Sequence, residues 1–178
     1  MRTKKFKTAI FVCTANFFRS RFSEYLFTFL AQKRGLPWRA TSRGLNTRIV
    51  DGEGPISEFA AYRLAAMGVP FDGERFPIQL SGADLENANL IVAVKKAEHH
   101  PMMLDQFPVW ADRIQYWHVD DIDCATADDA LSLCESCVKS LVDQLVAKQE
   151  QQEAPVKLRR AESTSKIVFG LQRQSRIY

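Results

Sequence analysis

The chain has 178 residues, a length that fits one domain with a single hydrophobic core. Its content of 46% hydrophobic and 25% charged residues is ordinary for a soluble globular protein, and a net charge of +3 is too small to indicate nucleic-acid binding. No hydrophobic run is long enough to span a membrane, and no signal peptide is evident. The 4 cysteines are irregularly spaced, which indicates a reducing, cytoplasmic setting without a disulfide framework.

The first half of the chain alternates between extended and helical patterns. A β-branched and aromatic run predicts a strand that ends directly before Cys13, and apolar residues at helical spacing predict a helix soon after it. Gly35 is placed to cap that helix. The predicted elements are a strand over residues 8–12, a helix over 20–33, a strand over 38–43, a polar loop over 44–54, and a helix that starts near Pro55 and ends at Gly68.

The second half continues the alternation. Ser81 is placed to cap a short helical turn, and the apolar run over residues 90–94 is typical of a buried parallel strand. A short helix over 95–104 follows, which Pro101 is expected to break. The last predicted elements are a strand over 114–119 and a helix capped by Thr126, with Asp128 and Asp129 in its first turn.

This order of elements predicts an α/β fold. Strands that alternate with helices form a parallel sheet with helices on both faces, here a three-layer sandwich around a four-stranded, mainly parallel sheet. Ligands bind such sheets beyond the carboxyl ends of the strands. Cys13 follows the first strand, and Asp120 and Asp121 follow the last one. We therefore expect these three residues at the same edge of the sheet.

The composition changes at Lys148, where Gln, Glu, Lys and Arg begin to dominate. From there to the end, seven basic residues outnumber three acidic ones. The sequence therefore predicts a domain over residues 1–147 and a basic, flexible C-terminal tail over 148–178. Two interpretations of the tail stay open: it is a solvated extension, or it is a segment that docks on an acidic partner or a membrane surface.

The loop between the first strand and the first helix carries the chemistry. Its N–H groups need acceptors and the helix presents its positive end, so the loop can cradle a tetrahedral oxyanion. The same field favours the thiolate form of Cys13, a nucleophile beneath a bound phosphoryl group. The guanidinium of Arg19 can bind the oxyanion through two parallel N–H bonds. Ser20 can donate a hydrogen bond to the thiolate. The phosphate-binding residues of this loop are then Thr14, Ala15, Asn16, Phe17 and Phe18, of which Asn16 tolerates a left-handed conformation.

The run from Val12 to Ser20, V-C-T-A-N-F-F-R-S, resembles the signature V-C-x-G-N-x-C-R-S of the low-molecular-weight protein tyrosine phosphatase family. The resemblance covers most of residues 6–147. It implies hydrolysis of phosphotyrosine, in a phosphorylated protein, or of a similar small phosphomonoester through a cysteinyl-phosphate intermediate, with no metal and no cofactor.

The resemblance also implies roles for residues outside the loop. The V-x-D-P segment of the family matches Val119 to Ile122, which makes Asp121 the general acid and leaves Asp120 as its rival. Ser42 matches a family serine that should hydrogen-bond to Asn16 and support the loop from behind. Glu24 matches a glutamate with a structural role.

Several positions depart from the family pattern. Ala15 replaces a loop glycine, Phe18 a second loop cysteine, and Arg21 the proline after R-S. Residues 46–50 contain no aromatic residue, although an aromatic pocket wall is expected there; Phe17 can supply part of such a wall. These departures bear on the substrate more than on the reaction. The remaining ones are Arg75 in place of a loop-supporting histidine, Ile122 in place of the proline after the acid, and Asp123 and Cys124 in place of an aromatic pair.

Two other functions stay open. A thiol-dependent arsenate reductase uses a similar loop, but it needs resolving cysteines that reach Cys13. A phosphoprotein-binding module would keep the anion-binding loop but would hydrolyse its ligand slowly or not at all. Cys134 and Cys137 are expected as buried apolar residues rather than zinc ligands, and His99 and His100 as solvated surface.

Overall fold

The structure is a computed structural model that describes residues 6–174, and the side chains of residues 6–152. Its centre is a four-stranded sheet in the order β2-β1-β3-β4, and neighbouring strands are parallel. The most central position of β1, between β2 and β3, places Cys13 at the middle of the carboxyl edge. The strands are β1 (Lys7–Cys13), β2 (Trp38–Gly44), β3 (Leu90–Ala93) and β4 (Gln115–Tyr116).

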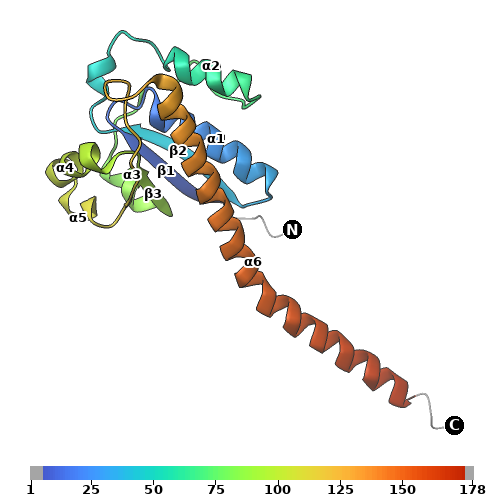
Figure 1. Ribbon diagram of the computed structural model, residues 1–178. Coiled ribbons are helices and arrows are strands. Elements are labelled where there is room, and N and C mark those ends of the chain that lie inside the picture. Colours follow the sequence, from blue (N-terminus) through green and yellow to red (C-terminus); the bar gives the residue numbers. More distant parts are fainter. Residues whose placement is uncertain (1–5, 175–178) are drawn as a thin grey trace. The chain divides into compact units, whose positions relative to one another are not determined.

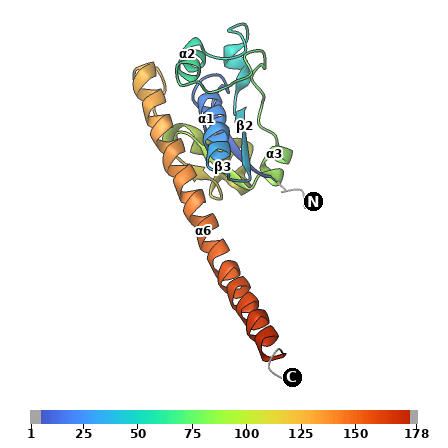
Figure 2. The same cartoon turned by 90° about the vertical axis from the view of Figure 1, so that its right-hand side faces the viewer.

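Helices cover both faces of this sheet (Figures 1 and 2). On one face Phe11 packs against Phe27 of α1, with ring centroids 5.6 Å apart. On the other face Ile10 and Val12 share a core cluster with side chains of α3, α4 and α5. The predicted three-layer α/β sandwich is thereby confirmed. The helices are α1 (Arg19–Lys33), the 3-10 turn η1 (Thr47–Val50), α2 (Glu58–Ala66), α3 (Gly82–Asn87), α4 (Lys96–Gln106), α5 (Pro108–Ala111) and α6 (Ala127–Gln174).

Two predicted elements differ from the structure, and two further elements were not predicted. Helix α4 runs unbroken through Pro101, since the fully buried side chains of His99 and Met103 hold it on both sides of that residue. Strand β4 has two residues instead of six, although the chain after it still bonds along β3, through Trp117 N to Ala93 O and Val119 N to Val94 O. Helix α5 and the turn η1 were not predicted.

The end of the chain forms one long helix in which the predicted tail begins. The chain divides into two compact units, Met1–Val142 and Asp143–Tyr178, and everything described below belongs to the first. The backbone of α6 is helical to Gln174, where the sequence predicted a flexible tail from residue 148. The side chains of residues 153–178 lie outside the described residues, so the docking role of the tail stays a prediction.

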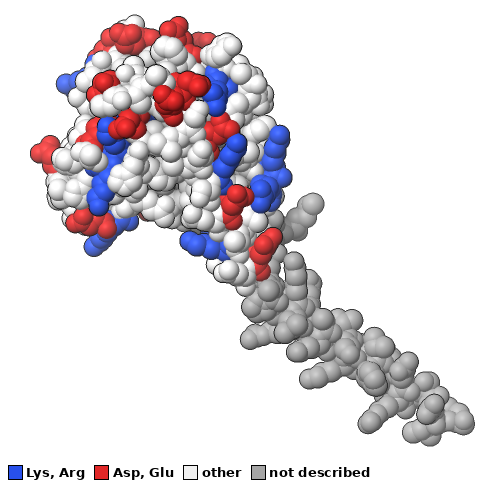
Figure 3. Space-filling view, in the orientation of Figure 1, with Lys and Arg blue, Asp and Glu red and all other residues white. Residues whose placement is uncertain are grey.

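The face shown in Figure 3 has no large patch of one charge sign over its described part. Acidic and basic residues are interspersed there over the described part of the surface.

Gly44 brings the end of β2 against the loop that follows β1. It pairs with Cys13 in the β1–β2 register, and its N–H and C=O bond to Ile78 O and Leu80 N. A Cβ atom on Gly44 would lie 2.9 Å from the Thr14 carbonyl oxygen and 2.7 Å from the Thr47 side chain. Only glycine therefore allows this close approach.

We predict that Gly44→Ala destabilises the protein by about 1–3 kcal/mol and lowers turnover, because the backbone of the loop must shift to admit the methyl group. Chemical denaturation measures the first effect. Gly82→Ala is the matched control, since a Cβ there meets nothing within 4 Å. Equal stability of the two variants would contradict this reading of Gly44.

Candidate active site

The loop between β1 and α1 surrounds the sulfur of Cys13. Asn16 adopts a left-handed conformation, with φ at 56°, and its N–H donates to Cys13 Sγ at 3.2 Å. Within the described part of the chain, the N–H groups of Thr14, Ala15, Phe17 and Phe18 find no protein acceptor. A ring of unpaired amides at the start of a helix is an anion-binding arrangement.

A chain of hydrogen bonds ties the sulfur to the sheet. Ser20 Oγ lies 2.9 Å from Cys13 Sγ, and Asn16 Nδ2 donates to Ser20 Oγ at 3.2 Å. Because Ser20 Oγ accepts from Asn16, its own proton is free to point at the sulfur. Asn16 Nδ2 also donates to Ser42 Oγ at 2.7 Å, the contact that the resemblance implies. All four residues are buried.

Two further residues hold Ser42 in place. Ser42 Oγ donates to Glu24 Oε2 at 2.5 Å, and Arg75 Nη2 bonds to the same carboxylate oxygen at 2.5 Å. Arg75 Nη2 also lies 3.3 Å from Ser42 Oγ. Arg75, which stands where the family often has histidine, thus contacts the same network as the loop asparagine.

The guanidinium of Arg19 is almost completely buried, with 1% of the residue exposed. Nη1 donates to Glu98 Oε2 at 3.0 Å and to Val119 O at 3.1 Å. Nη2 donates to Glu98 Oε1 at 3.1 Å and to Asp121 Oδ2 at 2.5 Å. Burial disfavours the charge, but the hydrogen bond to Glu98 and the negative charges around it outweigh burial and raise the pKa of Arg19.

Glu98 is a site residue that the sequence analysis missed. Its carboxylate accepts hydrogen bonds from both terminal nitrogens of Arg19 and from Thr14 Oγ1. Burial works against its charge, but hydrogen bonding from His99, Arg19 and Thr14 outweighs it, so the pKa of Glu98 lies far below its usual range. The available signal was its place in the first turn of α4, just beyond the carboxyl end of β3.

The expectation that His99 is solvated is wrong. The ring is fully buried, and its Nδ1 accepts from the backbone N–H of Lys95 at 3.0 Å. The ring proton of the neutral form is therefore on Nε2, which lies 3.2 Å from Glu98 Oε1. Burial lowers the pKa of His99, so the ring is neutral at physiological pH. His100, by contrast, is partly exposed and pairs with Asp112 at 3.0 Å.

The two candidate acids have different surroundings. Asp121 reaches Arg19 Nη2, and its other oxygen accepts from the backbone N–H of Ile122 at 2.9 Å. Asp120 points to Lys95 Nζ at 2.7 Å, and 52% of its side chain is exposed. Only Asp121 therefore contacts the residues of the phosphate loop.

Arg21, at the position of the family's proline, is also fully buried. Its Nη2 donates to Asp72 O and to the Tyr25 hydroxyl, each at 3.2 Å. Its Nε and Nη1 have no partner among the described residues. Burial, together with the charge of Arg75, lowers the pKa of Arg21. The hydrogen bonds of this guanidinium thus go to α1 itself and to the segment around Asp72, rather than to the phosphate loop.

Aliphatic side chains replace the expected aromatic wall around the loop. Ile49, in η1, is 59% exposed, and Ile122, next to Asp121, is 57% exposed. The turn η1 follows Asn46, whose N–H bonds to Thr14 O at 2.7 Å. Phe17 is half-buried, whereas Phe18 is buried in the core, so only the N–H of Phe18 can face a bound anion.

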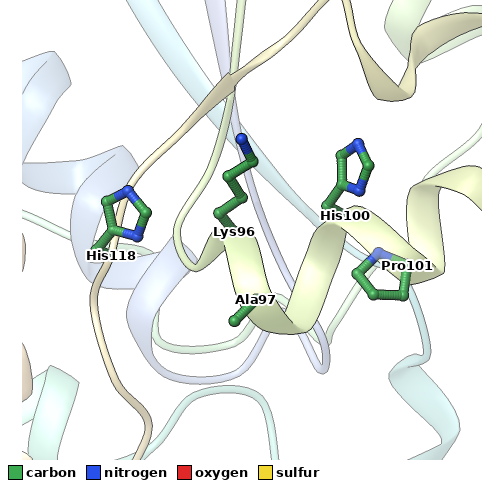
Figure 4. Close-up of a pocket in the computed structure, with 5 residues that line it drawn as sticks. All are labelled: Lys96, Ala97, His100, Pro101 and His118. Carbon is green, nitrogen blue, oxygen red and sulfur yellow. The ribbon is translucent and has the colours of Figure 1, made fainter.

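A separate pocket of about 370 Å³ lies on the outer side of α4. Figure 4 shows Lys96 between the rings of His100 and His118 at this pocket. Ala97 and Pro101 complete its lining, and Cys13 and Arg19 do not contribute to it. The pocket is therefore distinct from the phosphate loop.

On this fold, a loop with Cys13 at its start and Arg19 at its end, at the carboxyl edge of the sheet, defines a cysteine-based phosphatase. More particularly, the chain belongs to the low molecular weight phosphotyrosine protein phosphatase family, whose profile matches residues 8–154. No helix in the described part of the chain combines the length and the apolar character that a membrane span requires.

Solved structures share the fold. The low molecular weight protein tyrosine phosphatase of T. tengcongensis is 26% identical, with a TM-score of 0.65, over 80% of this chain and 99% of its own. Wzb of Vibrio vulnificus, solved with benzylphosphonate, is 16% identical, with a TM-score of 0.66, over 78% and 99%. The YwlE arginine phosphatase of Geobacillus stearothermophilus is 20% identical, with a TM-score of 0.62, over 84% and 96%. A comparison with curated protein sequences gives no match.

We predict that Ser20→Ala slows alkylation of Cys13 by iodoacetamide at neutral pH roughly 10-fold, because a hydrogen bond to a charged group contributes about 1.5 kcal/mol or more. Mass spectrometry of the peptide that contains Cys13 separates this reaction from that of the exposed Cys124. Ser136→Ala is the control, since its hydroxyl bonds only to Ser132 O on the exposed side of α6. An unchanged rate at Cys13 would show that Ser20 does not favour the thiolate.

Proposed function

We propose that this phosphatase hydrolyses phosphotyrosine, or a similar phosphomonoester, through a phosphate ester on the sulfur of Cys13. The observation that carries the proposal is the position of that sulfur, 3.2 Å from the Asn16 N–H and at the centre of a ring of unpaired loop amides. Such a ring stabilises the phosphoryl oxygens as charge develops on them.

Substrate binding begins with an exchange at Arg19. A guanidinium has five N–H donors, and four of those of Arg19 already meet acceptors on Glu98, Val119 and Asp121. Only Nε–H is left, so a bidentate grip on phosphate requires one carboxylate to leave. Asp121 holds Arg19 by a single bond, whereas Glu98 holds it by two, and Asp121 is therefore the group that leaves.

The same exchange prepares the acid. Once it has left Arg19, the Asp121 carboxyl group is free to reach the leaving oxygen of the substrate. The thiolate of Cys13 attacks phosphorus, the bond from phosphorus to the leaving oxygen breaks, and Asp121 gives its proton to that oxygen. Asp121 then takes a proton from water, whose oxygen attacks phosphorus, and the P–S bond breaks to restore the thiolate.

The surroundings of the loop favour a substrate with an apolar group next to the phosphate. Phe17 in the loop, Ile49 in η1 and Ile122 next to Asp121 each present partly exposed apolar surface. A phosphotyrosine ring can bury area against such side chains. Two structural neighbours carry the name of an arginine phosphatase, so a phosphoarginine peptide is the informative competitor substrate.

The arsenate reductase hypothesis requires a second, resolving thiol, and none of the other cysteines is suited to this role. Cys134 is fully buried, and burial raises its pKa to about 12. Burial also raises the pKa of Cys137, and hydrogen bonding to Asp123 raises that of Cys124. Thiols with raised pKa values are poor resolving nucleophiles at neutral pH.

We predict that the purified protein hydrolyses p-nitrophenyl phosphate near pH 6 and that Cys13→Ser abolishes this activity, because serine cannot replace the thiolate. Release of p-nitrophenolate measures turnover. Phosphate binding by the wild type without turnover would contradict the proposal and support a phosphoprotein-binding module instead.

We predict that Asp121→Asn lowers kcat for phenyl phosphate about 100-fold, because general acid catalysis contributes 10²-fold or more when the leaving group is a poor one. The loss should be smaller for p-nitrophenyl phosphate, whose leaving group needs less help from an acid. Asp120→Asn is the control, and its kcat should stay within about 3-fold of wild type. Equal losses in the two variants would show that the acid is wrongly assigned.

A further inference from the structure

Glu98 binds the end of the Arg19 guanidinium and leaves free the edge formed by Nε and Nη2, where a phosphate can bind. It takes one N–H from each terminal nitrogen of Arg19, in an end-on, bidentate pair. The remaining N–H of Nη2, which Asp121 now occupies, lies beside Nε–H on the other edge of the same plane. Once Asp121 leaves, this edge offers two parallel donors to a phosphate while Glu98 keeps its own pair.

The carboxylate of Glu98 is itself fixed. Thr14, the first residue of the phosphate loop after Cys13, donates its hydroxyl to Glu98 Oε1. His99 Nε2 lies on the other side of the same oxygen, and the ring is locked by its bond to Lys95 N. Among the described residues, the Asp121 carboxylate bonds only to Arg19 and to the N–H of the neighbouring Ile122. Of the two carboxylates, Glu98 is therefore the permanent partner and Asp121 the exchangeable one.

We propose that Glu98 is a positioning residue that aims Arg19 at the transferred phosphoryl group and links it to the loop through Thr14. The proposal rests on the proposed phosphatase activity. A guanidinium on a flexible side chain must be held to within about 0.5 Å to stabilise a transition state. The low pKa of Glu98 keeps the pair ionised across the working pH range.

A different role for the same carboxylate makes the opposite prediction. If Glu98 competed with phosphate for Arg19, its removal would tighten anion binding and raise kcat/KM. If Glu98 aims Arg19, its removal lowers kcat, because misplacement of a catalytic group by about 1 Å costs up to 100-fold.

The first test is a double-mutant cycle on kcat with p-nitrophenyl phosphate. Glu98→Gln should lower kcat between about 10- and 100-fold and change KM by less than about 3-fold, while Glu98→Asp recovers part of the loss. Lysine has no planar guanidinium to orient. In an Arg19→Lys background, Glu98→Gln should therefore change kcat by less than about 3-fold. Asp112→Asn, which removes an exposed carboxylate at the end of α5, should behave as wild type.

Several outcomes would overturn the proposal. They are a kcat of Glu98→Gln within about 3-fold of wild type, an increase in kcat/KM, or an equal loss in the two arginine backgrounds. An equal loss would mean that Glu98 supports the fold alone, and thermal melting of each variant identifies that case.

A second readout does not depend on turnover. Inorganic phosphate should protect Cys13 of the wild type from iodoacetamide, and Glu98→Gln should need about 10-fold more phosphate for equal protection. If the wild type has no phosphatase activity, the proposed function fails, and this measurement still decides whether Glu98 positions Arg19. Equal protection in both proteins would reject the role of Glu98.

Discussion

The site depends on the shared use of one buried guanidinium. Two carboxylates and a carbonyl oxygen use four of the five N–H donors of Arg19. Since a buried charge needs partners, these acceptors stabilise the fold without ligand. They also set a condition for binding, because a phosphate gains a bidentate contact only when Asp121 gives up its own.

This constraint connects binding to proton transfer. In the proposed mechanism, one movement of Asp121 opens an edge of Arg19 and brings a carboxyl group to the leaving oxygen, so that the bound anion prepares the acid. The other parts of the site must meanwhile stay still. Asn16 in its left-handed conformation, its bond to Ser42 and the close approach of Gly44 hold the loop amides around the sulfur. The site thus combines a rigid cradle with a single exchangeable contact.

Sequence patterns predicted the parts of this arrangement that are local. Thr8 to Ser20 contains a strand, a loop and a helix start within one short run, and its alternation with later elements gives the sheet. Glu98 could not be predicted in this way, since Lys95, Lys96 and two histidines around it indicate a polar, solvated helix. The turn after β3 points the first helical turn at the phosphate loop, and only the assembled sheet shows this. The match to the family segment that begins at Val119 already favoured Asp121 over Asp120 in the sequence, and the structure adds that Asp121 contacts Arg19 whereas Asp120 pairs with Lys95.

A crystal structure with vanadate or tungstate bound would test the account most directly. We expect the anion above Cys13 Sγ, bonded to the loop amides and to Nε and Nη2 of Arg19, with Asp121 moved off the guanidinium and Glu98 still paired to it. An anion bound elsewhere, or one that displaces Glu98 while Asp121 keeps its contact with Arg19, would contradict the account.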